Sequence, residues 1–130
     1  MKGIILPTKE EYDSLSKIEA KIGKEALTKA ELEIIRNKAD QGVPHWEFNW
    51  ALIELFDFNS EKNAIDWFEK ALEHMNGDGL LRCSGILASI GDEWEEMSMR
   101  YLRRAAWRQN PIAKRMIKAM RENPFHFPEA

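Results

Sequence analysis

Two segments of the chain share one pattern of side chains at a constant offset of 34 in the numbering, and this internal repeat restricts the fold more than any other feature. The segments are IDWFEKALEHMNG (65–77) and MRYLRRAAWRQNP (99–111). The matched pairs are Trp67 and Tyr101, Phe68 and Leu102, Lys70 and Arg104, Ala71 and Ala105, and Asn76 and Asn110. Because a fixed period of roughly 20 to 50 residues is typical of arrays of similar units, the chain is predicted to contain such units.

The same offset holds in the segment before each copy, so one period spans a helix, a turn and a second helix. The further pairs are Ala51 and Gly85, Leu52 and Ile86, Ile53 and Leu87, Phe56 and Ile90, and Asp57 and Gly91. KADQGV (38–43) also matches ALEHMN (71–76) at an offset of 33. The segment 29–41 therefore resembles the second helix of a unit, and the last helix resembles the first helix of an unfinished one.

Apolar residues recur every three or four positions along the chain, and no segment alternates as a strand does. The predicted helices are 9–22, 29–41, 44–57, 61–75, 79–90, 93–109 and 111–122. Capping boxes are predicted for Thr8 with Glu11, Thr28 with Glu31 and Asp92 with Glu95. Asn59 or Ser60 is predicted to cap the fourth helix, while Asn110 and Pro111 supply the N-cap and first position of the last. The fold is expected to be all-α, with about seven helices.

The length of 130 residues fits one domain that needs no metal or disulfide to fold. Cys83 is the only cysteine and lies in LLRCSGIL, so we expect a buried core residue and a reducing compartment. The first residues, MKGIILPTKEEY, contain too short an apolar run for a signal peptide or a membrane span. A cytoplasmic protein is the expectation.

Charge is separated along the sequence, although the net charge is only −3. Residues 53–97 carry eleven acidic and three basic side chains, whereas residues 98–121 carry eight basic and no acidic ones. Such blocks of one sign indicate charged surfaces.

The repeated pattern resembles the Sel1-like repeats, which are relatives of the tetratricopeptide repeats. KADQGVPHWEFNWAL carries the resemblance best, with Ala39, Gln41 and Gly42 in the turn, and Phe48, Trp50 and Ala51 on the next helix. DWFEKALEHMNGDG and RYLRRAAWRQNPIA follow the second-helix part, although Met75 and Gln109 stand where that family has a turn glycine. The resemblance covers roughly residues 30–120.

This resemblance implies a short right-handed α-solenoid in one domain, 1–130. Residues 1–28 would form an N-terminal capping helix, 29–122 the Sel1-like repeat region and 123–130 a tail. It also implies an adaptor or scaffold that binds other proteins. A compact helical bundle is the alternative, because shared apolar spacing alone makes helices look similar.

The sequence contains no arrangement of side chains that indicates catalysis. His45, His74 and His126 are far apart and lack a ligand spacing, so neither a metal nor another cofactor is expected. Ser84 and Ser89 lie on an apolar helix without a base. We therefore expect a protein that is not an enzyme.

The basic segment supplies the candidate partner-binding residues: Arg100, Arg103, Arg104, Arg108, Lys114, Lys118 and Arg121. Their spacing of four places Arg100, Arg104 and Arg108 on one helix face. Three interpretations stay open. The cations face the acidic helices before them, they bind an acidic protein, or they bind nucleic-acid phosphates.

The leading hypothesis is a non-catalytic protein-binding module. A specific version is an immunity or antitoxin-type protein that neutralises a toxin by binding it, through either the acidic 54–96 region or the basic 100–121 region. The alternative is a nucleic-acid-associated protein that uses its basic C-terminal helices.

Overall fold

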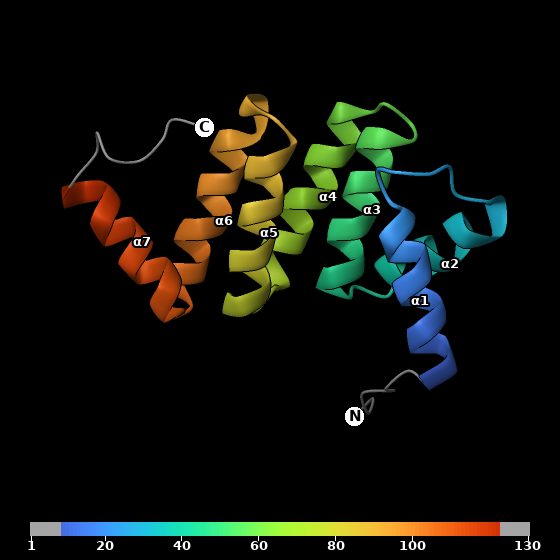
Figure 1. Cartoon of the computed structure of the whole chain (residues 1–130), viewed down its shortest axis with the longest axis horizontal. Coiled ribbons are helices and arrows are strands. Elements are labelled where there is room, and N and C mark those ends of the chain that lie inside the picture. The colour runs from blue at the N-terminus through green and yellow to red at the C-terminus, as the bar shows by residue number, and fades with distance from the viewer. Residues whose placement is uncertain (1–8, 123–130) are drawn as a thin grey trace. The chain divides into compact units, whose positions relative to one another are not determined.

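A computed structural model describes residues 9–122 of the chain (Figure 1). The helices are α1 (Lys9–Lys21), α2 (Lys29–Asp40), α3 (Pro44–Phe56), α4 (Glu61–His74), α5 (Gly77–Ile90), α6 (Glu95–Trp107) and α7 (Pro111–Glu122), and a 3-10 turn, η1 (Asp92–Trp94), precedes α6. These described residues contain seven α-helices and no strand, which confirms the predicted all-α class. Thr8, and with it the capping box predicted for the first helix, lies outside the described residues, as do His126 and the tail.

Two of the predicted helix starts are confirmed by their capping contacts. The Thr28 hydroxyl accepts a hydrogen bond from the Glu31 backbone N–H at 3.1 Å, and the Glu31 carboxylate accepts one from the Thr28 N–H at 2.9 Å. Before α7, the Asn110 side chain accepts a hydrogen bond from the Ala113 N–H at 2.9 Å. Of the two residues offered as the cap of α4, Ser60 is the one whose hydroxyl faces the first turn, at 3.4 Å from the Asn63 nitrogen.

Two other helix starts were predicted wrongly. The Asp92–Glu95 capping box does not form, because residues 92–94 make a 3-10 turn in which the Trp94 side chain is 4 % exposed. The helix predicted from residue 79 begins at Gly77 instead, since the Asn76 side chain caps it by accepting a hydrogen bond from the Gly79 N–H at 2.7 Å.

The chain divides into two compact units, an N-terminal unit of residues 1–68 and a C-terminal unit of residues 69–130. The core of the N-terminal unit contains Leu15, Ile18, Ile35, Ala39, Trp50 and Ile53, from α1, α2 and α3. Helix α3 is buried on more than one side, because every residue from Glu47 to Glu54 is buried. Burial of apolar surface from three helices is the main stabilising contribution here.

A buried carboxylate joins α3 to the start of α4 in the N-terminal unit. Glu54 is 8 % exposed and accepts hydrogen bonds from Trp50 Nε1 at 3.1 Å and from Asn63 Nδ2 at 3.2 Å. A buried charge is tolerated where such donors replace water. The turn between the two helices is fixed from the same residue, because the Ser60 N–H donates to the Glu54 carbonyl at 2.8 Å.

In the C-terminal unit, α5 and α6 are antiparallel neighbours (Figure 1). Ser84 Oγ donates to the Ser98 carbonyl and Ser98 Oγ donates to the Ser84 carbonyl, both at 2.8 Å. Both serines are buried, so small side chains and reciprocal hydrogen bonds hold these two backbones close together. Leu80, Leu87, Tyr101, Leu102 and Ala105 are buried beside them, and Cys83 is buried as predicted.

The element boundaries repeat at the spacing found in the sequence. The start of α4 at Glu61 and the start of α6 at Glu95 are separated by the same offset of 34 in the numbering, and so are the ends of α3 at Phe56 and of α5 at Ile90. The turns after α2 and α6 share a backbone conformation, because Gly42 and Gln109 have φ values of 79° and 67°. Each is followed two residues later by the proline that begins the next helix. Gln109 therefore occupies the left-handed position that a glycine fills in the earlier turn.

None of the helices in residues 9–122 has both the length and the apolarity that a membrane span requires.

Candidate protein-interaction surface

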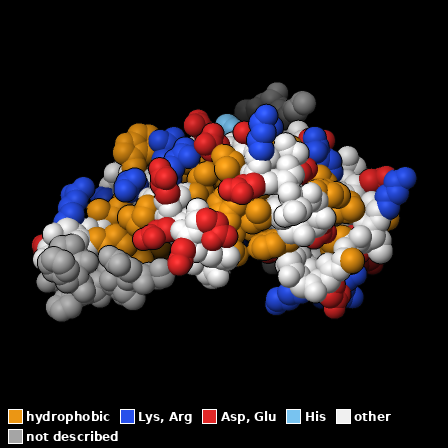
Figure 2. All heavy atoms as spheres, turned by 90° about the horizontal axis from the view of Figure 1, so that it is seen from above, with side chains coloured by type: hydrophobic (Ala, Val, Ile, Leu, Met, Phe, Trp, Pro, Cys, Tyr) orange, Lys and Arg blue, Asp and Glu red, His pale blue; other side chains and the backbone are white. Residues whose placement is uncertain are grey.

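All seven cations predicted as partner-binding residues lie in the C-terminal unit. Arg100, Arg103 and Arg104 project from α6, Arg108 is its C-cap residue, and Lys114, Lys118 and Arg121 project from α7. We call these seven residues the basic surface. Figure 2 shows hydrophobic side chains exposed beside Lys and Arg side chains in the part of the chain that carries α6 and α7.

Trp107 stands at the centre of this surface and is 65 % exposed, although it is one of the largest apolar side chains. Two arginines lie against its ring, with Cζ to ring-centroid distances of 4.5 Å for Arg104 and 5.8 Å for Arg108. Such cation–π contacts are worth about 0.5 to 1 kcal/mol at exposed sites. The ring is therefore held in place by its neighbours while its surface stays open to solvent.

The first of two grooves on the basic surface is lined by Leu72, Glu73, Arg100, Arg103, Arg104 and Trp107. Part of its charge is balanced within the protein. Arg100 Nη1 lies 3.2 Å from Glu69 Oε1, and Arg108 Nη2 donates to the Glu73 backbone carbonyl at 2.9 Å. The interpretation that the cations face the preceding acidic helix thus holds for Arg100.

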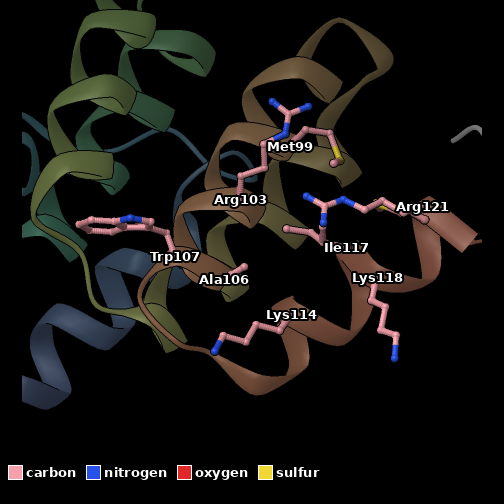
Figure 3. Close-up of a pocket in the computed structure, with 9 residues that line it drawn as sticks. Met99, Arg103, Ala106, Trp107, Lys114, Ile117, Lys118 and Arg121 are labelled. Atoms are coloured by element: carbon pink, nitrogen blue, oxygen red, sulfur yellow. The ribbon is translucent and has the colours of Figure 1, made fainter.

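The second groove runs between α6 and α7 and has a volume of about 610 Å³; we call it the α6–α7 groove. Its apolar lining comes from Met99, Ala106, Ile117 and Met120, with Trp107 at one end. Its cationic lining comes from Arg103, Lys114, Lys118 and Arg121. In Figure 3, Ile117 and Arg121 extend from α7 towards Met99 and Arg103 on α6, while Lys114 and Lys118 lie at the edge.

The two grooves share Arg103 and Trp107, so the structure brings cations of α6 and of α7 together around these two residues. Arg103 is exposed, and none of the ion pairs among the described residues involves it. Lys118 makes a loose contact with Glu122 at 3.9 Å, and Lys114 bonds the Gln109 side chain. Cations that are not fully neutralised within the protein can pair with anionic groups on a partner.

The predicted residue set did not include the apolar part of the site. Trp107, Met99, Ile117 and Met120 follow the apolar spacing of their helices, which in a sequence also describes a buried stripe. Trp107 is exposed, whereas Met99, Ile117 and Met120 are partly buried along the groove. Their position in a groove depends on how α7 leaves α6, and Figure 1 shows α7 diverging from α6 beyond the turn at residues 108–110.

A smaller aromatic and cationic cluster lies in the N-terminal unit. The Arg36 guanidinium lies 5.3 Å from the Trp50 ring centroid and 5.1 Å from that of Trp67, and Arg36 Nε also bonds Asp40 at 3.0 Å. Nearby, Phe56 and Phe58 are about half exposed and line a groove with Leu27 and Leu32. Burial raises the pKa of the Asp57 carboxyl group, and Asp57 stands between the two phenylalanines in the sequence.

The described residues hold no group of three or more His, Cys, Asp and Glu side chains placed to bind a metal ion. His45 instead contacts the Glu19 carboxylate at 2.6 Å.

No protein-family model matches this chain, and neither a curated protein nor a solved structure matches it.

Proposed function

We propose that this protein is a non-catalytic binding module that recognises an acidic protein partner through its basic surface. The observation that carries the proposal is Trp107, an exposed ring held by Arg104 and Arg108 and bordered by two cationic grooves. Tryptophan and arginine are the side chains most often found at the energetic centres of protein interfaces. Because the Trp107 ring and its two arginines already hold one another in place, less side-chain entropy is lost on binding.

The proposal includes the architecture that the repeat pattern favours, a short right-handed α-solenoid of Sel1-like units in the cytoplasm. The matching positions of the helix starts Glu61 and Glu95 support repeated units, as does the shared left-handed turn at Gly42 and Gln109. A more specific form of the proposal is an immunity or antitoxin-type protein whose basic surface covers an acidic site on a toxin.

A protein partner is favoured over nucleic acid by the apolar content of the basic surface. Met99, Ile117 and Met120 line the α6–α7 groove and would lie unused against a phosphate backbone. At a protein interface, by contrast, apolar side chains surrounded by charges form the usual arrangement of core and rim.

The test is affinity capture from the native host with the full chain and with an Arg100→Glu, Arg104→Glu, Arg108→Glu variant. We expect the wild type to retain a specific acidic protein and the variant to lose it. Lys17→Glu, Lys29→Glu, Lys62→Glu is the matched control, because these three lysines are exposed and lie in the N-terminal unit. Retention of the partner by the arginine variant would contradict the proposal, as would salt-sensitive binding of generic DNA or RNA without a protein partner.

A further inference from the structure

The capping residues of α5 and α7 place these two helices in the same position of the repeat. Asn76 caps α5 and Asn110 caps α7, each through its side-chain oxygen and the backbone N–H three residues later. The two asparagines are one of the pairs matched at the offset of 34 found throughout the chain. Every residue of α7 can therefore be compared with the residue of α5 that holds the same place in the preceding period.

In this comparison, buried positions of α5 correspond to cations in α7. Leu80, Ser84 and Leu87 are buried, and Ser84 bonds Ser98 on α6. The corresponding residues of α7 are Lys114, Lys118 and Arg121, and all three are exposed. The face through which α5 packs on the second helix of its unit thus carries positively charged residues at the corresponding positions of α7. No second helix follows α7 among the described residues.

The apolar positions beside this row are kept. Cys83 and Ile86 of α5 correspond to Ile117 and Met120 of α7, and both of these line the α6–α7 groove. A helix that packs there would meet an apolar centre and a cationic edge. Because ionised side chains buried without partners are strongly destabilising, such a helix must carry carboxylates next to its apolar stripe.

We propose that the α6–α7 groove binds an acidic amphipathic α-helix of the partner protein, in the place that the second helix of the next repeat unit would take. This inference rests on the proposed function and specifies its partner. A second copy of this chain is not the occupant. Its acidic helix α4, which is the second helix of a repeat unit, already buries the apolar residues Phe68 and Ala71 within its own chain. The arginine-rich α6 is excluded as an occupant by its like charge.

The experiment uses a fluorescent synthetic peptide of about 18 residues, long enough for partial helicity, with Leu at helical spacing and Glu at the flanking positions. Its binding to the full chain is measured by fluorescence anisotropy, and its helicity by circular dichroism. We expect binding with a gain of helicity. Lys114→Glu, Lys118→Glu, Arg121→Glu should weaken binding at least about tenfold, and the matching glutamine variant should weaken it less. Lys17→Glu, Lys29→Glu, Lys62→Glu should leave the affinity unchanged.

Two control peptides distinguish recognition of an amphipathic helix from attraction by negative charge alone. One carries Gln in place of Glu, and the other has the same composition with Leu at every second position, so that no helical stripe forms. Equal binding of either control would overturn the inference, and so would equal affinity of the wild type and the α7 glutamate variant. If the peptide fails while capture still depends on Arg100, Arg104 and Arg108, the proposed function stands and only the helical form of the partner is wrong.

Discussion

The Arg104 guanidinium lies against the Trp107 ring, with 4.5 Å between the arginine Cζ atom and the ring centroid. The Nε atom of Arg104 is buried, whereas Trp107 is 65 % exposed. The pair therefore presents an anchored aromatic surface to solvent at the point where the two grooves meet.

Trp107→Ala should remove most of the affinity for the partner and little of the stability. Truncating an aromatic residue at an interface centre costs about 2 kcal/mol or more, which is roughly a 30-fold rise in Kd. The free energy of unfolding should change by less than about 1 kcal/mol, because the ring is mostly exposed. Calorimetric titration of the captured partner and urea unfolding measure the two quantities. Phe58→Ala is the control, and an equal loss of affinity in both variants would argue against a role for Trp107.

Gln109→Gly should stabilise the protein by about 0.5 to 1 kcal/mol, since Gln109 has a φ of 67° and only glycine adopts that region without strain. Gly42→Gln should destabilise it for the same reason, because Gly42 has a φ of 79°. Gln41→Gly is the control, as Gln41 has a φ of −73° and gains nothing from glycine. Chemical denaturation measures all three, and stabilisation by Gln41→Gly rather than Gln109→Gly would refute the explanation.

Glu54→Gln should destabilise the N-terminal unit by about 1 to 3 kcal/mol. Both carboxylate oxygens of Glu54 accept hydrogen bonds, from Trp50 and from Asn63, and a glutamine amide can accept only one of them. Its NH₂ group would face the other donor in a buried site. Thermal unfolding followed by tryptophan fluorescence tests this, with Glu33→Gln as an exposed control. Equal melting temperatures for the two variants would show that the buried network contributes nothing.

The Glu31 carboxylate should make the free energy of unfolding depend on pH in the acidic range. Hydrogen bonds from the Thr28 backbone N–H and from Lys21 lower the pKa of Glu31 below its ordinary value of 4.5. A lowered pKa means that the folded state favours the ionised form, so this stabilisation is complete above the ordinary pKa and is lost as the pH falls through the folded-state pKa. Glu31→Gln should therefore unfold at a lower temperature than wild type near about pH 6 and approach it near about pH 3. A gap that persists in acid would refute the assignment.

The helices and three of their caps, those of α2, α4 and α7, could be predicted because their signals are local. Thr28 with Glu31, and Asn110 with Pro111, lie next to the backbone groups that they satisfy. The start of α6 could not be predicted, because burial of Trp94 overrides the local signal of Asp92 and Glu95. The helix predicted from residue 79 begins two residues earlier, at Gly77. An added Cβ at Gly77 would lie 3.3 Å from Asn110 Cβ, so the small size of this residue serves packing.

The candidate site was predictable only in part, because only the positions along a single helix are a local property of the sequence. Spacing along one helix placed Arg100, Arg104 and Arg108 on one face, and the structure keeps them together around Trp107. The groove that joins Arg103 to Arg121 is formed by two helices that meet through a turn. The angle between these two helices cannot be predicted from the spacing of residues within each of them.

The central claim, that the basic surface binds an acidic protein, is tested most directly by isothermal titration of the captured and purified partner into the wild type and three variants. Arg103→Glu alone and Arg100→Glu, Arg104→Glu, Arg108→Glu should each weaken binding, by about tenfold and by more than about a hundredfold. Lys17→Glu, Lys29→Glu, Lys62→Glu should bind as the wild type does, and added salt should weaken the wild-type complex most. Equal affinities for the arginine variants and the wild type, with all four proteins folded, would contradict the claim.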